Sequence, residues 1–93
     1  MYQLIIRPRA EKDLDHLPAD IRRRVVGAIS QLANDPRPKG CKKLFDGVYR
    51  IREGEYRVIY AIKDSEHIVD IGKITRRSEN TYKDLNNLLH STP

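Results

Sequence analysis

The spacing of hydrophobic positions is helical in the first part of the chain and alternating in the second. Residues 2–7 are rich in β-forming side chains and stop at Pro8, so we predict an opening strand there. Residues 9–17 carry apolar side chains at helical spacing and predict a short helix. A longer apolar stripe predicts a second helix, formed by Ile21, Val25, Ala28, Ile29 and Leu32. This helix should end near Asn34, because the Asp-Pro-Arg-Pro sequence that follows cannot continue it.

The second part of the chain has the pattern of strands joined by tight turns. An expected loop at residues 35–47 precedes three alternating segments, which predict strands at residues 48–52, 56–63 and 67–74. The breaks at Glu53-Gly54 and Asp64-Ser65 are short enough for two-residue hairpin turns. A last helical stripe predicts a C-terminal helix, formed by Tyr82, Leu85, Leu88 and Leu89.

Together these elements predict an α+β domain in the order β-α-α-β-β-β-α. We expect a mostly antiparallel four-stranded sheet with two N-terminal helices and a C-terminal helix. A chain of 93 residues can bury one modest core and has no room for a second, so we assign residues 1–93 to a single domain.

The net charge of the chain limits the classes of partner that we expect for this domain. The chain has 18 Lys and Arg against 13 Asp and Glu, and the net charge of +5 favours a polyanionic partner such as nucleic acid. No apolar run approaches the roughly 20 residues that cross a bilayer, and the first residues lack the layout of a signal peptide. We therefore expect a cytoplasmic protein without a membrane partner. The single Cys41 and the dispersed histidines have no metal-ligand spacing, so neither a metal nor a cofactor is expected.

The first predicted hairpin concentrates arginine on one face. A two-residue turn at Glu53-Gly54 would place Arg52 opposite Glu55 and Arg50 opposite Arg57. Because opposed residues share a face, the three arginines should project together, with the apolar residues on the other face. Opposed arginines repel each other, whereas a phosphate bound between them would make the arrangement favourable. The alternative is a solvated charged face in which Glu55 neutralises Arg52.

Further basic residues follow the last predicted strand. The turn at Asp64-Ser65 would place Gly72 opposite Arg57, so the chain beyond it could bring Arg76 or Arg77 to the same end of the sheet. Tyr82 comes shortly afterwards. It fits the apolar stripe of the last helix, and it could instead stack on a base or donate a proton.

Several motifs spread over nearly the whole chain occur together in one known family. They are Ile6-Arg7-Pro8-Arg9-Ala10, Pro36-Arg37-Pro38 followed by Lys43-Leu44, Tyr49-Arg50-Ile51-Arg52, Tyr56-Arg57-Val58-Ile59-Tyr60, and the tail from Gly72-Lys73 to Tyr82. With these motifs the chain resembles the RelE/ParE superfamily of type II toxins, the toxin halves of bacterial toxin–antitoxin pairs. The paired motifs of the hairpin are the most specific, and they resemble the RelE branch more than the ParE branch.

The resemblance implies a function, a site and partners. RelE toxins cut messenger RNA in the ribosomal A site, where the 2′-hydroxyl attacks the neighbouring phosphate, and no metal or cofactor is implied. The implied catalytic residues are Arg50, Arg52, Arg57, Arg76 and Tyr82. In addition, we expect four basic residues to bind RNA: Lys42, Lys43, Lys73 and Arg77. The implied partners are the ribosome with its messenger and a cognate antitoxin, with which a heterotetramer is one assembly to expect.

One departure from the family pattern bears on the chemistry. RelE toxins often carry lysine where this chain has Arg50 and Arg52, and arginine cannot give up its proton as a lysine of depressed pKa can. We therefore expect these two side chains to stabilise charge, and Tyr82 or Lys73 to move the 2′ proton. Two alternatives stay open: a ParE-like inhibitor of DNA gyrase, and a weakened relative that only binds an antitoxin.

Overall fold

The computed structural model describes residues 1–76 of the chain. The elements are β1 (Gln3–Ile6), α1 (Pro8–Asp15), α2 (Ala19–Gln31), β2 (Lys42–Phe45), β3 (Val48–Glu53), β4 (Tyr56–Lys63), the short 3₁₀ turn η1 (Asp64–Glu66) and β5 (Ile68–Arg76). The predicted C-terminal helix falls on residues 77–93 and lies outside the described residues. The α+β class and the order of the first six predicted elements are confirmed.

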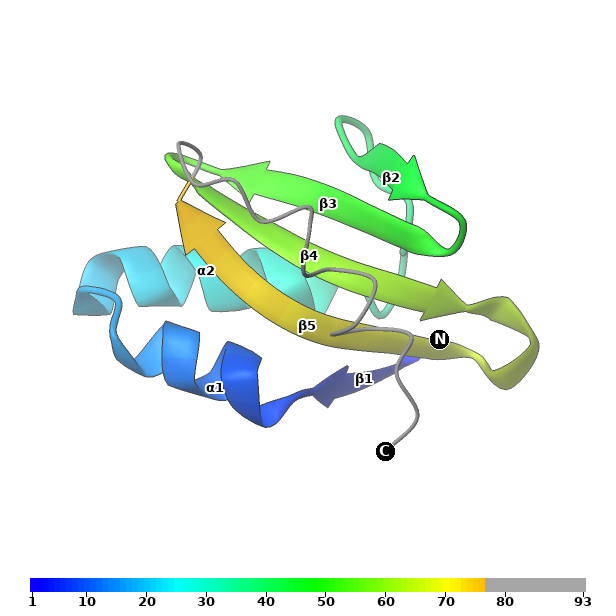
Figure 1. Ribbon diagram of the computed structural model, residues 1–93, viewed down its shortest axis with the longest axis horizontal. Coiled ribbons are helices and arrows are strands. Elements are labelled where there is room, and N and C mark those ends of the chain that lie inside the picture. The colour runs from blue at the N-terminus through cyan, green and yellow to red at the C-terminus, as the bar shows by residue number, and fades with distance from the viewer. Residues whose placement is uncertain (77–93) are drawn as a thin grey trace.

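The strands form one mixed sheet of five, in the order β1-β5-β4-β3-β2. β1 runs parallel to β5, and the other neighbours are antiparallel. Both helices pack on the same face of this sheet (Figure 1). Within residues 1–76, no helix covers the opposite face. Neither helix in this part of the chain is long and apolar enough to cross a membrane.

The prediction of four strands is wrong, because the expected loop at residues 35–47 contains β2. Only four residues long, β2 pairs with β3 through Lys42 opposite Arg50 and Phe45 opposite Val48, with a register irregularity between Lys43 and Phe45. A segment this short has no readable alternation of its own. Its conformation comes from pairing with β3 and from the packing of Leu44 and Phe45 on Val48.

The larger of the two hydrophobic clusters in residues 1–76 lies between the helices and the sheet, as the apolar stripe of α2 predicts. Val25, Ile29 and Leu32 are buried against residues of the central strands, among them Tyr60 and Ile71. The buried Tyr60 hydroxyl donates a hydrogen bond of 2.7 Å to the carbonyl of Pro36. Desolvation by burial is the main reason that the pKa of this hydroxyl is raised. This hydrogen bond attaches the loop after α2 to the middle of the sheet.

A buried carboxylate joins the first helix to the last strand. Arg7, at the entrance to α1, donates hydrogen bonds of 2.9 and 2.8 Å to the two carboxylate oxygens of Asp70 on β5. The Asp70 side chain is only 4% exposed, and Lys63 Nζ lies 3.5 Å from it. A charge buried this far needs such partners, because an isolated carboxylate loses its hydration.

Candidate functional site

The hairpin of β3 and β4 differs from the predicted one in its register. Arg52 lies opposite Arg57, and Arg50 lies opposite Ile59, so the predicted Arg50–Arg57 and Arg52–Glu55 pairs are wrong. The two-residue loop is Gly54-Glu55, because only Gly54 in the turn has a positive φ (61°) and a type II′ turn takes glycine at its first loop position.

A shift of two residues leaves every side chain on its predicted face, because side chains alternate with a period of two. Arg50, Arg52 and Arg57 therefore share the face opposite the helices, as predicted. Directly opposed arginines also remain, with Arg52 in place of Arg50 as the partner of Arg57.

The register of β5 adds two further residues to this face. Gly72 was expected opposite Arg57, but Thr75 occupies that position and Lys73 lies opposite Ile59. Two features account for the error. The β4–β5 connection spans four residues between the paired Lys63 and Ile68, and the register slips by one between Ile59 and Tyr60. Gly72 is the extra, unpaired residue of this β-bulge, and no local pattern in the sequence predicts the bulge.

Two rows of side chains consequently cross the face of the sheet opposite α1 and α2. One row contains Arg52, Arg57 and Thr75, and the next contains Lys42, Arg50, Ile59 and Lys73. We call the set of Arg50, Arg52, Arg57, Lys73 and Thr75 the basic face. Sequence analysis missed Thr75, because its position depends on the bulge.

Members of the basic face differ in their exposure. Arg52 is exposed and Arg57 is half-buried, whereas Lys73 is 5% and Arg50 9% exposed. Arg50 donates a hydrogen bond of 3.3 Å to the carbonyl of Gly40. In residues 1–76, neither Arg52 nor Lys73 forms an ion pair with an acidic side chain. The Arg52–Arg57 pair is thus the part of the face most open to a ligand.

The other predicted site residues are distributed around this face. Lys42 extends it onto β2, opposite Arg50. Lys43 alternates away from it and forms an ion pair of 3.4 Å with Asp46. Arg76 is at the same end of the sheet but pairs with Tyr56 on the other side, and its guanidinium lies 5.9 Å from the centre of that ring. Arg77 and Tyr82 lie outside the described residues.

A carboxylate from α1 holds the end of β5 in place. β1 stops at Ile6, opposite Ile71, so β5 continues beyond it without a strand on that side. There Asp13 accepts a hydrogen bond of 3.0 Å from the backbone N–H of Ile74, and its other oxygen lies 3.2 Å from Arg9 Nε. Asp13 therefore supports the segment that carries Lys73 and Thr75.

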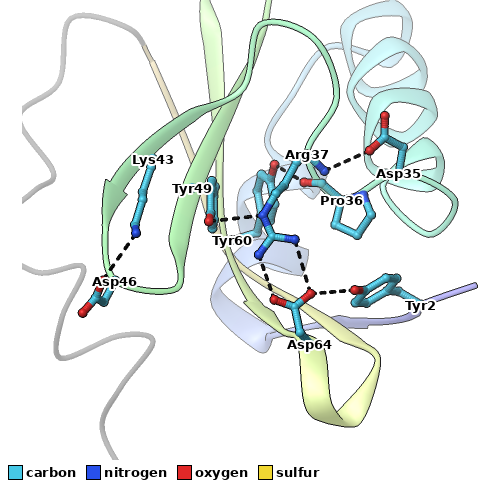
Figure 2. A network of polar contacts seen from close by, with 9 residues as sticks. All are labelled: Tyr2, Asp35, Pro36, Arg37, Lys43, Asp46, Tyr49, Tyr60 and Asp64. Carbon is cyan, nitrogen blue, oxygen red and sulfur yellow. Dashed lines mark hydrogen bonds and ion pairs between the residues drawn. The ribbon is translucent and has the colours of Figure 1, made fainter.

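A second polar network lies at the far end of the sheet, by the β4–β5 connection. Figure 2 shows Arg37 reaching from the loop after α2 to Asp64, with hydrogen bonds of 3.3 and 2.8 Å, and to the Tyr49 hydroxyl at 3.2 Å. Tyr2 donates to the same carboxylate at 2.6 Å. These hydrogen bonds, first from Arg37 and then from Tyr2, lower the pKa of Asp64 to about 2. The Pro36-Arg37-Pro38 motif thus has a structural role in joining three segments.

The described part of the chain offers no metal site, since no three His, Cys, Asp or Glu side chains within residues 1–76 lie close enough to share an ion. The basic face instead combines positively charged side chains with the buried hydroxyl of Thr75. Such a face can bind a polyanion through charge-assisted hydrogen bonds and can stabilise charge that develops on it.

Comparison with known proteins identifies the family of the chain. A family model described as the ParE toxin of type II toxin-antitoxin system, parDE, matches residues 4–81. Toxin RelE of Mycobacterium tuberculosis is 38% identical over 80 residues, which cover 83% of this chain and 82% of that protein.

Solved structures give the same assignment. The toxin–antitoxin complex RelBE2 of Mycobacterium tuberculosis contains a chain with a TM-score of 0.72 and 30% identity, covering 82% of this chain and 98% of that one. The archaeal RelE-RelB complex of Pyrococcus horikoshii OT3 contains one with a TM-score of 0.73 and 27% identity, covering 85% and 98%. The chain therefore belongs to the RelE/ParE superfamily and is a toxin of a type II toxin–antitoxin system, of the RelE family.

Proposed function

We propose that this toxin is a ribosome-dependent endoribonuclease that cleaves messenger RNA in the A site, with the basic face holding the scissile phosphate. The observation that carries the proposal is the direct opposition of Arg52 and Arg57 on the face of the sheet opposite α1 and α2. Like charges placed opposite each other across two strands destabilise a sheet. A phosphate between the two guanidinium groups would accept hydrogen bonds from both and reverse the sign of that contribution.

The proposed reaction is an internal transesterification of RNA. The 2′-oxygen forms a bond to phosphorus, the bond to the 5′-oxygen breaks, and a 2′,3′-cyclic phosphate remains on the upstream fragment. Negative charge builds up on the phosphorane oxygens and on the leaving oxygen. Arg52 and Arg57 would stabilise that charge by contact, and the buried Arg50 would add to the positive potential around it.

Proton transfer needs a different residue, because arginine stays protonated. The 2′-hydroxyl must lose a proton to a base, and the leaving 5′-oxygen must gain one. Lys73 is the lysine of the basic face, opposite Ile59 and one row from the arginine pair. We propose that Tyr82 or Lys73 takes the 2′ proton and that the acid so formed protonates the leaving 5′-oxygen, while the ribosome holds the RNA in line for attack.

We also infer a cognate antitoxin as partner, since the similar solved structures include RelE chains bound to RelB. An acidic segment of such a partner would neutralise the basic face. A heterotetramer with it remains a prediction.

A translation extract tests the proposal. Purified toxin should produce new message ends within the A-site codon, and Arg57→Ala should reduce their rate about 100-fold or more, as the loss of a group that stabilises transition-state charge does. Unchanged cleavage by Arg57→Ala would contradict the role of the basic face. Inhibition of gyrase supercoiling without message cleavage would instead support the ParE-like alternative.

A further inference from the structure

A pocket of about 390 Å³ opens at the edge of the sheet beside the basic face. Its walls are the last turns of α2, the loop at residues 38–40, and residues 50–52 of β3. β2 lies along the first half of β3 (Figure 1) and, of these three residues, pairs with Arg50. The lining includes Gln31, Lys39, Arg50 and Arg52. The volume is within the range of pockets that hold small ligands.

The backbone of β3 offers hydrogen-bonding groups to this pocket. The first pair between β2 and β3 is Lys42 with Arg50, so within residues 1–76 Arg52 is paired with a strand only on its β4 side. Backbone groups of an antiparallel strand point alternately to its two sides. The Gly47 carbonyl accepts a hydrogen bond from the backbone N–H of Ile62 of β4. The backbone N–H and C=O groups of odd-numbered β3 residues therefore point to β4, and those of Arg52 point away from β4 toward the pocket. An N–H donor and a carbonyl acceptor thus lie side by side at the pocket.

The side chains around this backbone suit a flat, polar-edged ligand with an attached negative charge. Ala28, Pro38 and Ile51 supply apolar walls, and Gln31 is exposed at the rim with an amide that can both donate and accept. Among the described residues, the charged side chains of the lining are Lys39, Arg50 and Arg52. All three are basic, so the pocket favours an anion.

Arg50 connects the pocket to the basic face. Its side chain belongs to the face by register, and its guanidinium reaches over the edge to the carbonyl of Gly40, 3.3 Å away in the pocket wall. Arg52 contributes to both places as well, since its side chain lies on the face and its backbone lines the pocket. A ligand bound across the two sites would have its phosphate on the face and a neighbouring group in the pocket.

We infer that this pocket binds the base of the RNA nucleotide adjacent to the scissile phosphate, with Gln31 and the backbone of Arg52 reading the edge of the base. The inference rests on the proposed function, because it takes RNA as the substrate of the basic face. It assigns Gln31 to the choice of cleavage sequence and leaves charge stabilisation to the arginines.

Binding of RNA that cannot be cut tests the pocket directly. The probes are four 2′-O-methyl homotrinucleotides, in which the attacking hydroxyl is blocked, titrated into the purified chain and followed by backbone amide NMR. We expect shifts at Gly40 and Arg52 and an affinity that depends on the base. Gln31→Ala should reduce the spread in affinity among the four probes about fivefold, the effect of one hydrogen bond. Ser30→Ala, an exposed α2 neighbour outside the pocket lining, is the matched control and should keep the wild-type spread.

A second variant fills the pocket. Ala28→Leu should abolish the shift at Gly40 while the amide of Thr75 on the basic face still responds, which also shows that the variant is folded. Equal Gly40 shifts in Ala28→Leu and the wild type would overturn the inference, as would an unchanged spread of affinities in Gln31→Ala. A strand-forming peptide that shifts Gly40 and Arg52 when no trinucleotide does would assign this edge to a protein partner and also overturn it.

Failure of the proposed function gives a different result. If the trinucleotides bind in the pocket but ribosome-bound message stays intact, the endoribonuclease proposal fails and the base-binding pocket stands. If message is cut in the A site with the same sequence preference by the wild type and Gln31→Ala, the pocket inference fails and the endoribonuclease proposal stands.

Discussion

Arg52 of β3 lies directly opposite Arg57 of β4, on the face of the sheet opposite α1 and α2. Two opposed arginines cost stability in the free protein and favour a bound phosphate. Arg52 is exposed, so its substitution should change the charge of the pair with little loss of packing.

Stability and activity should therefore respond in opposite directions at this position. Arg52→Gln should raise the free energy of unfolding by a few tenths to about 1 kcal/mol, because it removes the repulsion, and should decrease message cleavage. Urea denaturation at low and high salt measures the first effect, and the gain should shrink as salt screens the charges. Arg23→Gln, on the exposed side of α2, is the control. A loss of stability in Arg52→Gln would contradict this account of the pair.

Asp13 should act as a positioning residue for β5. Its carboxylate accepts the Ile74 N–H at 3.0 Å, so Asp13→Ala leaves that donor without its partner and should cost about 1–3 kcal/mol. Amide hydrogen exchange should accelerate most at Ile74. Asp13→Asn keeps an acceptor oxygen, so the Ile74 amide of this variant should exchange at nearly the wild-type rate. Asp15→Ala, an exposed α1 neighbour, controls for charge on this helix. Equal exchange at Ile74 in Asp13→Ala and Asp15→Ala would refute the role.

The Arg37–Asp64 network predicts a specific acid dependence of stability. The folded-state pKa of Asp64 is about 2, below its ordinary value of 3.8, so the carboxylate stabilises the fold above that ordinary value. This contribution should fade as pH falls from about 4 to about 2. Asp64→Asn should therefore be less stable than the wild type at pH 6, and the difference should narrow over that window.

Tyr2→Phe provides the graded comparison, because it removes only one of the two groups that hydrogen-bond to Asp64. Its loss of stability at pH 6 should be smaller than that of Asp64→Asn, in urea unfolding followed at several pH values. A constant difference between Asp64→Asn and the wild type from pH 6 to pH 2 would show that the ion pair does not contribute as described.

The buried hydroxyl of Tyr60 should contribute through its hydrogen bond to Pro36. Tyr60→Phe should lower the free energy of unfolding by about 0.5–1.5 kcal/mol, because the carbonyl loses its 2.7 Å partner. Tyr56→Phe, half-buried on the same strand, is the control and should cost less. A Tyr60→Phe variant as stable as the wild type would contradict this contribution.

Side-chain faces could be predicted from the sequence, whereas the pairing across strands could not. Side-chain alternation in the hairpin places Arg50, Arg52 and Arg57 on one face in any register that differs from the predicted one by an even number of residues. The opposed pair depended on which two residues form the turn, and the positive φ of Gly54 selects Gly54-Glu55. The predicted limits of β4 were correct, because both of its ends are marked by turns.

Features that depend on contacts distant in sequence lay beyond local reasoning. β2 forms only against β3, and the bulge at Gly72, which brings Thr75 opposite Arg57, depends on how β4 and β5 pack. The hydrogen bond between Asp13 and Ile74 spans 61 positions of the sequence. Family resemblance was necessary to name the reaction, since a basic sheet face is compatible with several polyanions.

The most direct test of the proposed reaction uses one altered atom in the substrate. Ribosomes are programmed with two messages that differ only in a 2′-deoxy nucleotide at the A-site cleavage position, and purified toxin is added to each. The account predicts cleavage of the all-ribose message to a 2′,3′-cyclic phosphate end, no cleavage of the deoxy message, and loss of cleavage with Arg57→Ala. Equal cleavage of both messages, or an intact all-ribose message, would contradict it.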